Sequence, residues 1–268
     1  MRKHLSVLAL AARGTVCRAI AITILAAALA GALLWLVPAY EDRVVYANED
    51  GSVTSEYYPI DFKYLPAKTG AAAVCAVGFA ALLAVLSLNG CGYGAKTGLT
   101  VRRLRIGEDS LCLWWTLYNA VCVLFYWAVM AAVCVAVVKL RIDTVQMPYG
   151  SYTPGPQTLL LSVYSGSFLH HLLPLRDATV WVENLLLTAL CAAAAAQFSH
   201  AQRRGHFSIA PLLALALTIL SFFFPMGSST TLLVCLVTAL ALGITLWQFQ
   251  KGETDDDAKT DFRTAQDA

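Results

Sequence analysis

Residues that could do chemistry are few in this sequence, and the first group is a run of glycines. The segment Gly90–Thr97 reads Gly-Cys-Gly-Tyr-Gly-Ala-Lys-Thr and has several residues of a phosphate-binding loop. That loop requires a glycine before its lysine and a strand before its first glycine, whereas here Ala95 precedes Lys96 and an apolar stretch leads in. We interpret the segment as a flexible inner linker. No Gly-x-Ser-x-Gly or His-Glu-x-x-His motif occurs, so the sequence predicts neither an enzyme nor a bound cofactor.

The histidines and cysteines do not predict a metal site. His170 and His171 are adjacent, so on a helix they point about 100° apart and cannot share a metal as residues i and i+4 would. The cysteines lie in or at the ends of apolar stretches, where small, soft side chains pack well. They are Cys17, Cys75, Cys91, Cys112, Cys122, Cys134, Cys191 and Cys235.

Glu183 and Asn184 are polar residues within an apolar stretch. Ionisable groups inside a membrane are costly and often functional, so these two residues are candidates for lining a pathway. Glu183 also stands about one turn into its stretch, close to the outer interface. A structural carboxylate that reaches the interface or complements the helix dipole is therefore the alternative.

The elements that must position these residues are membrane-spanning helices. Hydrophobic residues make up 58 % of the 268 residues and charged residues 13 %, about half the charged share of soluble domains. About 20 apolar residues in a helix span a membrane core of about 30 Å. We expect an all-α fold with six spans, at Ala19–Val37, Ala71–Leu88, Leu111–Val138, Val180–Phe198, Ile209–Phe224 and Thr230–Trp247.

Shorter elements are expected around these spans. Leu5–Ala12 is apolar with flanking charge and predicts an N-terminal interfacial helix. Residues 39–68 mix tyrosines with valine-rich pairs and indicate a small extended or hairpin element. Leu159–Leu173 is too short to cross and predicts an interfacial or re-entrant outer helix. We divide the chain into a transmembrane domain, residues 1–250, and a disordered acidic tail, residues 251–268.

The basic residues predict the orientation of the chain. With both termini in the cytoplasm, 13 of the 19 lysines and arginines lie on the inner side, which satisfies the positive-inside tendency. The outer six are Arg43, Lys63, Lys68, Lys139, Arg141 and Arg176. We therefore expect an integral protein of a bacterial cytoplasmic membrane with an uncleaved first span. The net charge of +2 gives no indication of nucleic-acid binding.

The inner loop Lys96–Ser110 is the most informative polar segment. Thr100 can cap a short helix in which Val101, Leu104 and Ile106 form a narrow apolar stripe. One interpretation is a basic loop that fixes topology and touches anionic membrane lipid. The other is a lever that docks onto a cytoplasmic partner.

This loop resembles the segment between the second and third spans of ABC-2-type exporter permeases. The residues that carry the resemblance, and that it implies as partner-binding, are Leu99, Thr100, Val101, Arg102, Arg103, Leu104, Arg105 and Ile106. In that family the segment forms a coupling helix that meets a separate ATPase subunit, and six spans with short outer re-entrant elements are typical. The resemblance thus implies an ABC ATPase partner and a second permease chain, identical or different.

Three functions are weighed from the sequence, of which the third, an intramembrane enzyme, would need catalytic groups that we do not find in it. The first is a permease-like subunit of an ABC-type export complex, which would depend on a separate ATPase because the sequence has no nucleotide-binding motif. The second is a non-transporting membrane scaffold or accessory subunit, which would explain why the spans carry so few charges.

Overall fold

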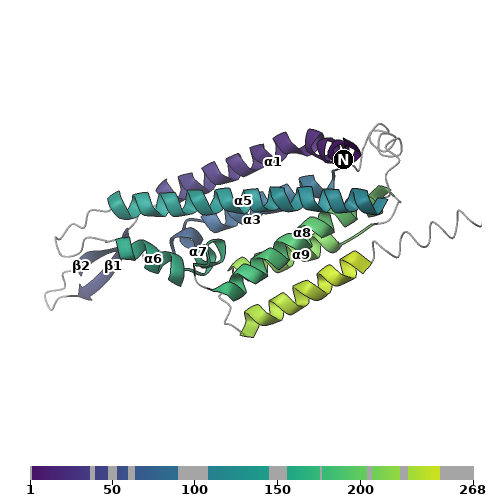
Figure 1. Ribbon diagram of the computed structural model, residues 1–268. Coiled ribbons are helices and arrows are strands. Elements are labelled where there is room, and N and C mark those ends of the chain that lie inside the picture. Colours follow the sequence, from purple (N-terminus) through teal and green to yellow (C-terminus); the bar gives the residue numbers. More distant parts are fainter. Residues whose placement is uncertain are drawn as a thin grey trace, which may run out of the picture.

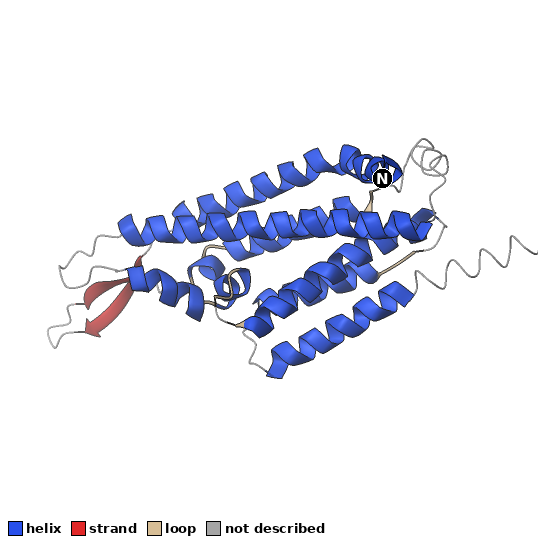
Figure 2. Ribbon diagram, viewed as in Figure 1, coloured by secondary structure: helices blue, strands red, loops and turns tan. Residues whose placement is uncertain are grey.

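The computed structural model describes residues 2–36, 40–47, 53–59, 64–89, 108–144, 156–175, 177–203, 207–223 and 229–247. These residues form long helices packed along one another, with one pair of strands at an end of the bundle (Figure 1, Figure 2). We call the end that holds the first residues of the chain the inner end. The end that holds the strands is the outer end, after the orientation expected from the basic residues.

Four helices of the described chain are long and apolar enough to cross a membrane. They are α1 (Arg2–Leu36), α5 (Glu108–Thr144), α8 (Ala178–Arg203) and the final helix, Ser229–Trp247. The chain is therefore an integral membrane protein.

The final helix illustrates how the lipid-facing surface is built. It buries threonines seven residues apart, Thr231, Thr238 and Thr245, whereas Leu232 and Leu240 on its other faces are each 60 % exposed. Lipid tails are as apolar as leucine, so exposing leucine to them has no cost, while small polar residues allow close helix packing. This helix places its polar stripe inward and its apolar surface outward, as a lipid-exposed helix should.

The expected count of six spans is confirmed only in part. The second and fifth expected spans correspond to α3 (Ala71–Ser87) and α9 (Ala210–Phe223), apolar helices of 17 and 14 residues. At 1.5 Å per residue they extend about 25 Å and about 21 Å, which is short of a core of about 30 Å. Both helices pack against α8 inside the bundle. That α3 and α9 also cross the membrane, which would make six spans, therefore remains a prediction.

The expected N-terminal interfacial helix is wrong as a separate element. Residues 5–12 continue without a break into the first span, because Arg2–Leu36 is a single helix. No proline interrupts residues 5–12. The helical turn that follows them, around Thr15, packs against α5. Thr15 Oγ1 lies 2.9 Å from Tyr118 Oη of α5, and both residues are buried. A helix anchored at this turn has no hinge at which an interfacial segment could bend away.

The hairpin expected in residues 39–68 is confirmed. Strands β1 (Tyr40–Ala47) and β2 (Val53–Pro59) pair antiparallel, with Tyr40 opposite Pro59 and an irregular register between Val44 and Tyr46. A short helix, α2 (Leu65–Lys68), then leads into α3. Within the described residues, the fold is helical apart from this hairpin.

The outer segment Leu159–Leu173 forms two short helices instead of one. They are α6 (Pro156–Ser165) and α7 (Ser167–Leu172), separated at Gly166, whose backbone is extended. Neither is long enough to cross a membrane, as the sequence predicts. Helix α7 packs against α5 and α9 near the outer end (Figure 1).

The core where α1, α3 and α5 meet is built around a glycine. The Tyr126 hydroxyl donates a 2.6 Å hydrogen bond to the Cys75 carbonyl oxygen, which ties α5 to α3. A Cβ atom at Gly78 would lie 2.6 Å from Ala26 Cβ and 2.7 Å from Tyr126 Oη, closer than real Cβ contacts. The three helices can approach this closely only because residue 78 has no side chain.

Helix α8 is the centre of the bundle. Every residue from Cys191 to Gln197 is buried, so this part of the helix is covered on all sides. Five of the seven are alanines, whose small side chains let neighbouring helices approach on each face. Residues 96–107 of the inner loop and residues 251–268 of the tail lie outside the described residues.

Candidate functional site

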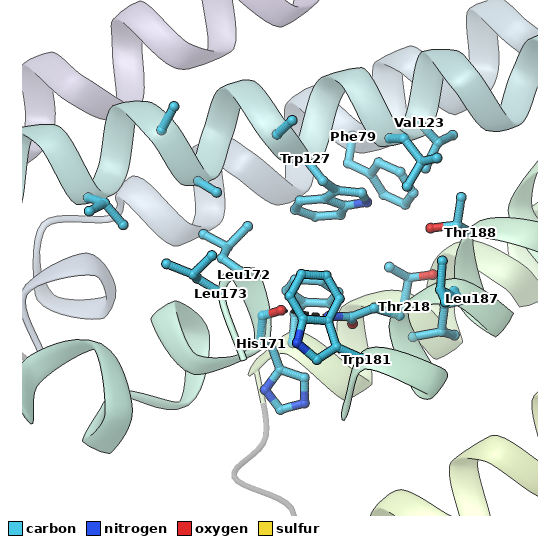
Figure 3. A pocket seen from close by; sticks show the side chains of 18 of the residues that line it. Phe79, Val123, Trp127, His171, Leu172, Leu173, Trp181, Leu187, Thr188 and Thr218 are labelled. Atoms are coloured by element: carbon cyan, nitrogen blue, oxygen red, sulfur yellow. Dashed lines mark hydrogen bonds between the residues drawn. The ribbon is translucent and has the colours of Figure 1, made fainter. Parts of the chain in front are cut away.

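A cavity of about 580 Å³ lies in the outer half of the bundle, between α5, α7, α8 and α9 (Figure 3). This volume falls within the range of roughly 300–1,000 Å³ that is usual for small-molecule sites. Phe79 of α3 also contributes to its wall. We take this cavity as the candidate functional site.

The cavity exists because α5 and α8 touch at one end and separate at the other. Toward the inner end, Asn119 Nδ2 donates a 3.3 Å hydrogen bond to the Ala192 carbonyl oxygen, which joins the two helices. Toward the outer end the helices diverge, and α7 enters the gap (Figure 1). The space left between them is the cavity.

The wall on α5 extends along most of the membrane depth and contains a stripe of small side chains. Ala128, Ala132 and Ala136 line the cavity at intervals of one helical turn. The whole wall begins at Val123 and ends at Lys139, a rise of about 24 Å at 1.5 Å per residue. Small side chains on this face leave room that longer ones would fill.

The cavity opens sideways between α5 and α8. Leu124 and Trp181 line it and are each 48 % exposed, and Leu185 is 58 % exposed. Exposed apolar side chains at this depth of a membrane protein face lipid. The opening therefore faces the interior of the bilayer.

The deep wall is aromatic. Trp127 of α5 stacks on Phe222 of α9 with ring centroids 4.5 Å apart and an interplanar angle of 10°. Phe79 lies 4.9 Å from Trp127 between centroids. In Figure 3, Trp127 and Phe79 lie on one side of the cavity and Trp181 on the other. These flat, rigid surfaces fit an apolar ligand.

Polar groups in the wall lie toward both ends of the cavity. At the outer end are Lys139, which is exposed, and Asn184, whose Nδ2 donates a 2.7 Å hydrogen bond to the His171 carbonyl oxygen. Asn184 Oδ1 is buried and makes no hydrogen bond within the described chain. Deeper in the wall, Thr218 donates to the Ala214 carbonyl oxygen at 2.8 Å. Its oxygen lies 3.4 Å from Cys191 Sγ, so the deeper polar atoms satisfy one another.

The two candidate pathway residues have different surroundings. Asn184 lines the cavity, whereas Glu183 points about 100° away around α8 and lies against α9. Glu183 is 0 % exposed, and its Oε1 accepts a 2.5 Å hydrogen bond from Ser221 Oγ. Its Oε2 has no hydrogen bond within the described residues. Glu183 does not reach the interface, because α9 covers this face of α8, so of the structural alternative only a carboxylate that complements the helix dipole stays open.

The histidine pair contacts Asp177 through His170 and belongs to no metal-binding cluster within the described residues. His170 Nε2 lies 2.9 Å from Asp177 Oδ2, and the centroids of the two histidine rings are 6.4 Å apart. Among the described residues, no group of three or more histidine, cysteine or acidic side chains could hold a metal ion. The partner-binding candidates, Leu99–Ile106, lie outside the described residues.

The cavity was not predicted from the sequence. Its signal is the alternation of small residues on one face of α5, at Ala128, Ala132 and Ala136. Alanines four residues apart also mark tight helix contacts, as they do on α8, so this signal alone does not distinguish a cavity from packing. Compared with models of protein families, curated protein sequences and solved structures, the chain matches none, so its function has to be argued from this geometry.

Proposed function

We propose that this chain is the membrane-spanning, permease-like subunit of an export complex driven by a separate ATPase, which docks on the inner loop 96–110. One observation carries the proposal. The loop joins α3 to α5, and both helices form walls of the cavity. Phe79 contributes from α3, and residues between Val123 and Lys139 contribute from α5. A partner that moves the loop acts directly on the cavity.

The two helices are coupled firmly enough to move together. Tyr126 of α5 donates its 2.6 Å hydrogen bond to the Cys75 carbonyl oxygen of α3, one turn before Phe79. The rings of Tyr126 and Phe79 are also in contact, with centroids 5.9 Å apart. A rigid displacement of this pair relative to α8 would change the width of the cavity, as in other helix-shift transitions.

The inner end of the bundle is closed by polar contacts that such a displacement would have to break. Ser199 Oγ of α8 donates a 2.5 Å hydrogen bond to the Asn89 carbonyl oxygen, which follows α3. The Arg203 guanidinium lies 4.9 Å from the ring centroid of Trp115 of α5. These contacts join α3, α5 and α8 where the loop begins and ends. They support a conformation in which the inner end of the bundle is closed while the cavity is open toward the bilayer.

Co-purification with an ATPase encoded beside this chain tests the proposal. Leu104→Asp should abolish recovery of the ATPase, because a leucine buried in a partner contributes about 1.5–3 kcal/mol. Arg102→Ala combined with Arg103→Ala should weaken recovery only partly, because exposed charges contribute less. Thr260→Asp places the same charge in the tail and serves as the matched control, with no expected loss.

Membrane insertion of each variant is measured in parallel, so that a folding defect is not mistaken for lost docking. If the native chain recovers no ATPase, the proposal fails and the non-transporting scaffold or accessory subunit becomes the better account. Equal recovery with native Leu104 and with aspartate there would also contradict docking through this loop.

A further inference from the structure

We propose that the cavity binds an anionic lipid of the outer leaflet, with the charged head group at Lys139 and an acyl chain extended along α5 toward Trp127. From the sequence, lipid is expected only as the surrounding membrane and as a contact of the inner loop. The structure assigns a specific lipid site at the opposite end of the bundle.

The shape of the cavity fits an acyl chain. Its wall on α5 runs about 24 Å from Val123 to Lys139, most of a membrane core of about 30 Å. The lining is largely apolar, and the alanine stripe makes one side of it smooth. The opening at Trp181 and Leu185 faces the bilayer, so a lipid can enter sideways without leaving the membrane.

The charge distribution fixes the direction in which the lipid lies. Lys139 lines the outer end of the cavity and is exposed, and no acidic side chain lines the part of the cavity that the structure describes. The opposite end, at Val123 and Leu187, carries no charged side chain, and the hydroxyl of Thr218 there already donates to the Ala214 carbonyl oxygen. A molecule with one anionic end and one apolar end therefore binds with its anionic end outward. Lysines near a membrane surface attract anionic lipids by about 1 kcal/mol each.

Asn184 adds a second polar anchor near the same end. Asn184 lines the cavity, and its Oδ1 is buried and accepts no hydrogen bond from a described residue. A buried acceptor without a donor is costly, so a ligand that brings a hydroxyl or amide N–H is favoured. Lipids that carry a hydroxyl close to an anionic phosphate meet both requirements, and phosphatidylglycerol is the natural probe.

If the chain exports a substrate, this inference names the substrate class and to that extent rests on the proposed function. Lipid binding is measured on the purified chain without any ATPase. A failure to bind lipid therefore leaves the docking test untouched, and a failure to dock leaves the lipid site untouched.

Tryptophan quenching by brominated lipids tests the site. The purified chain is placed in vesicles that contain a rising fraction of phosphatidylglycerol with brominated acyl chains, and separate vesicles contain brominated phosphatidylcholine. We expect saturable quenching at a low fraction of the anionic lipid, and only gradual quenching by the zwitterionic one. Trp181→Phe should remove part of the saturable component. Trp247→Phe, which removes an exposed tryptophan of the final helix, should leave it unchanged.

Two pairs of variants test the two ends of the site. Lys139→Gln should weaken the apparent affinity for the anionic lipid about five-fold. Arg141→Gln is its control, because Arg141 lies 5.8 Å from the Trp35 ring and does not line the cavity. Ala132→Phe fills the alanine stripe and should weaken binding of the acyl chain at least about five-fold. Ala28→Phe, at an exposed position of α1, is the matched control.

The inference is overturned if both lipids quench equally, or if quenching rises gradually without saturation. It is also overturned if the Lys139 and Ala132 variants, recovered as stably folded protein, bind the anionic lipid as tightly as their controls. Retained anion preference with the Lys139 variant alone would remove the head-group assignment and contradict the stated direction of binding.

Discussion

Replacing Gly78 by alanine should destabilise the protein far more than a single methyl group normally does. The added Cβ would lie 2.6 Å from Ala26 Cβ on α1 and 2.7 Å from Tyr126 Oη on α5. Carbon atoms in contact prefer about 3.5–4.0 Å, so α1 and α3 would have to separate by about 1 Å. Alternatively the Tyr126 ring must move and lose its bond to the Cys75 carbonyl oxygen.

The size of the effect follows from these two routes. Overpacking a well-packed core costs about 1–3 kcal/mol, and leaving a buried hydrogen-bonding group unsatisfied costs about 1–3 kcal/mol. We expect a loss of about 2–4 kcal/mol, which corresponds to a thermal midpoint lower by about 5–15 °C for a chain of this size. The lost stability should come from weaker packing between α1, α3 and α5.

The assay is the thermal midpoint of the protein purified in detergent, followed by the fraction that remains monodisperse after heating. Gly243→Ala is the matched control, because nothing lies within 4 Å of a Cβ atom built at this glycine of the final helix. Combining Gly78→Ala with Ala26→Gly should recover part of the loss, since it removes the closest of the two contacts. Equal midpoints for the Gly78 and Gly243 variants would refute the packing described for these helices.

Three further predictions use the same assay. Glu183→Ala should lower the free energy of unfolding by about 2–4 kcal/mol, because it leaves Ser221 Oγ without its acceptor and opens a void, whereas Glu183→Gln should retain most of the stability. A native-like midpoint for the alanine variant would contradict this. Asn119→Ala should cost about 1–2 kcal/mol by removing the donor to the Ala192 carbonyl oxygen, and an unchanged midpoint would mean that this bond does not hold α5 to α8. Ala194→Leu should lower the free energy of unfolding by about 1–3 kcal/mol, because α8 is covered on all sides there. Ala178→Leu, at an exposed position of the same helix, should leave it unchanged. Equal effects of the two variants would contradict the central position of α8.

Hydropathy along the chain predicts six spans, and four of them are helices long and apolar enough to cross a membrane. The four long spans and the short outer segment follow from the length of apolar runs, and the outer hairpin follows from the mix of tyrosines with valine-rich pairs. The continuity of α1 was not predictable in this way, because the bond between Thr15 and Tyr118 joins residues 103 positions apart. Flanking charge suggested an interfacial helix, but packing against α5 continues the span.

The site was less predictable than the fold for a related reason. In a soluble helix, apolar periodicity marks the buried face, but here lipid and core are equally apolar and the signal disappears. Glu183 illustrates this: its burial depends on Ser221 of α9, 38 residues later in the chain. The cavity likewise depends on where α8 diverges from α5, which no local pattern of residues records.

Every functional inference depends on which side of the membrane each end of the bundle faces. Labelling of single cysteines in a cysteine-free background, with a reagent that cannot cross the membrane, measures this directly. In intact cells the reagent should reach Ser55→Cys in the hairpin and Ser151→Cys in the second outer loop. It should not reach Thr97→Cys in the inner loop or Thr260→Cys in the tail until the membrane is opened. Labelling at position 97 in intact cells would contradict the account, because the ATPase could not reach its loop and the head-group end of the cavity would face the cytoplasm.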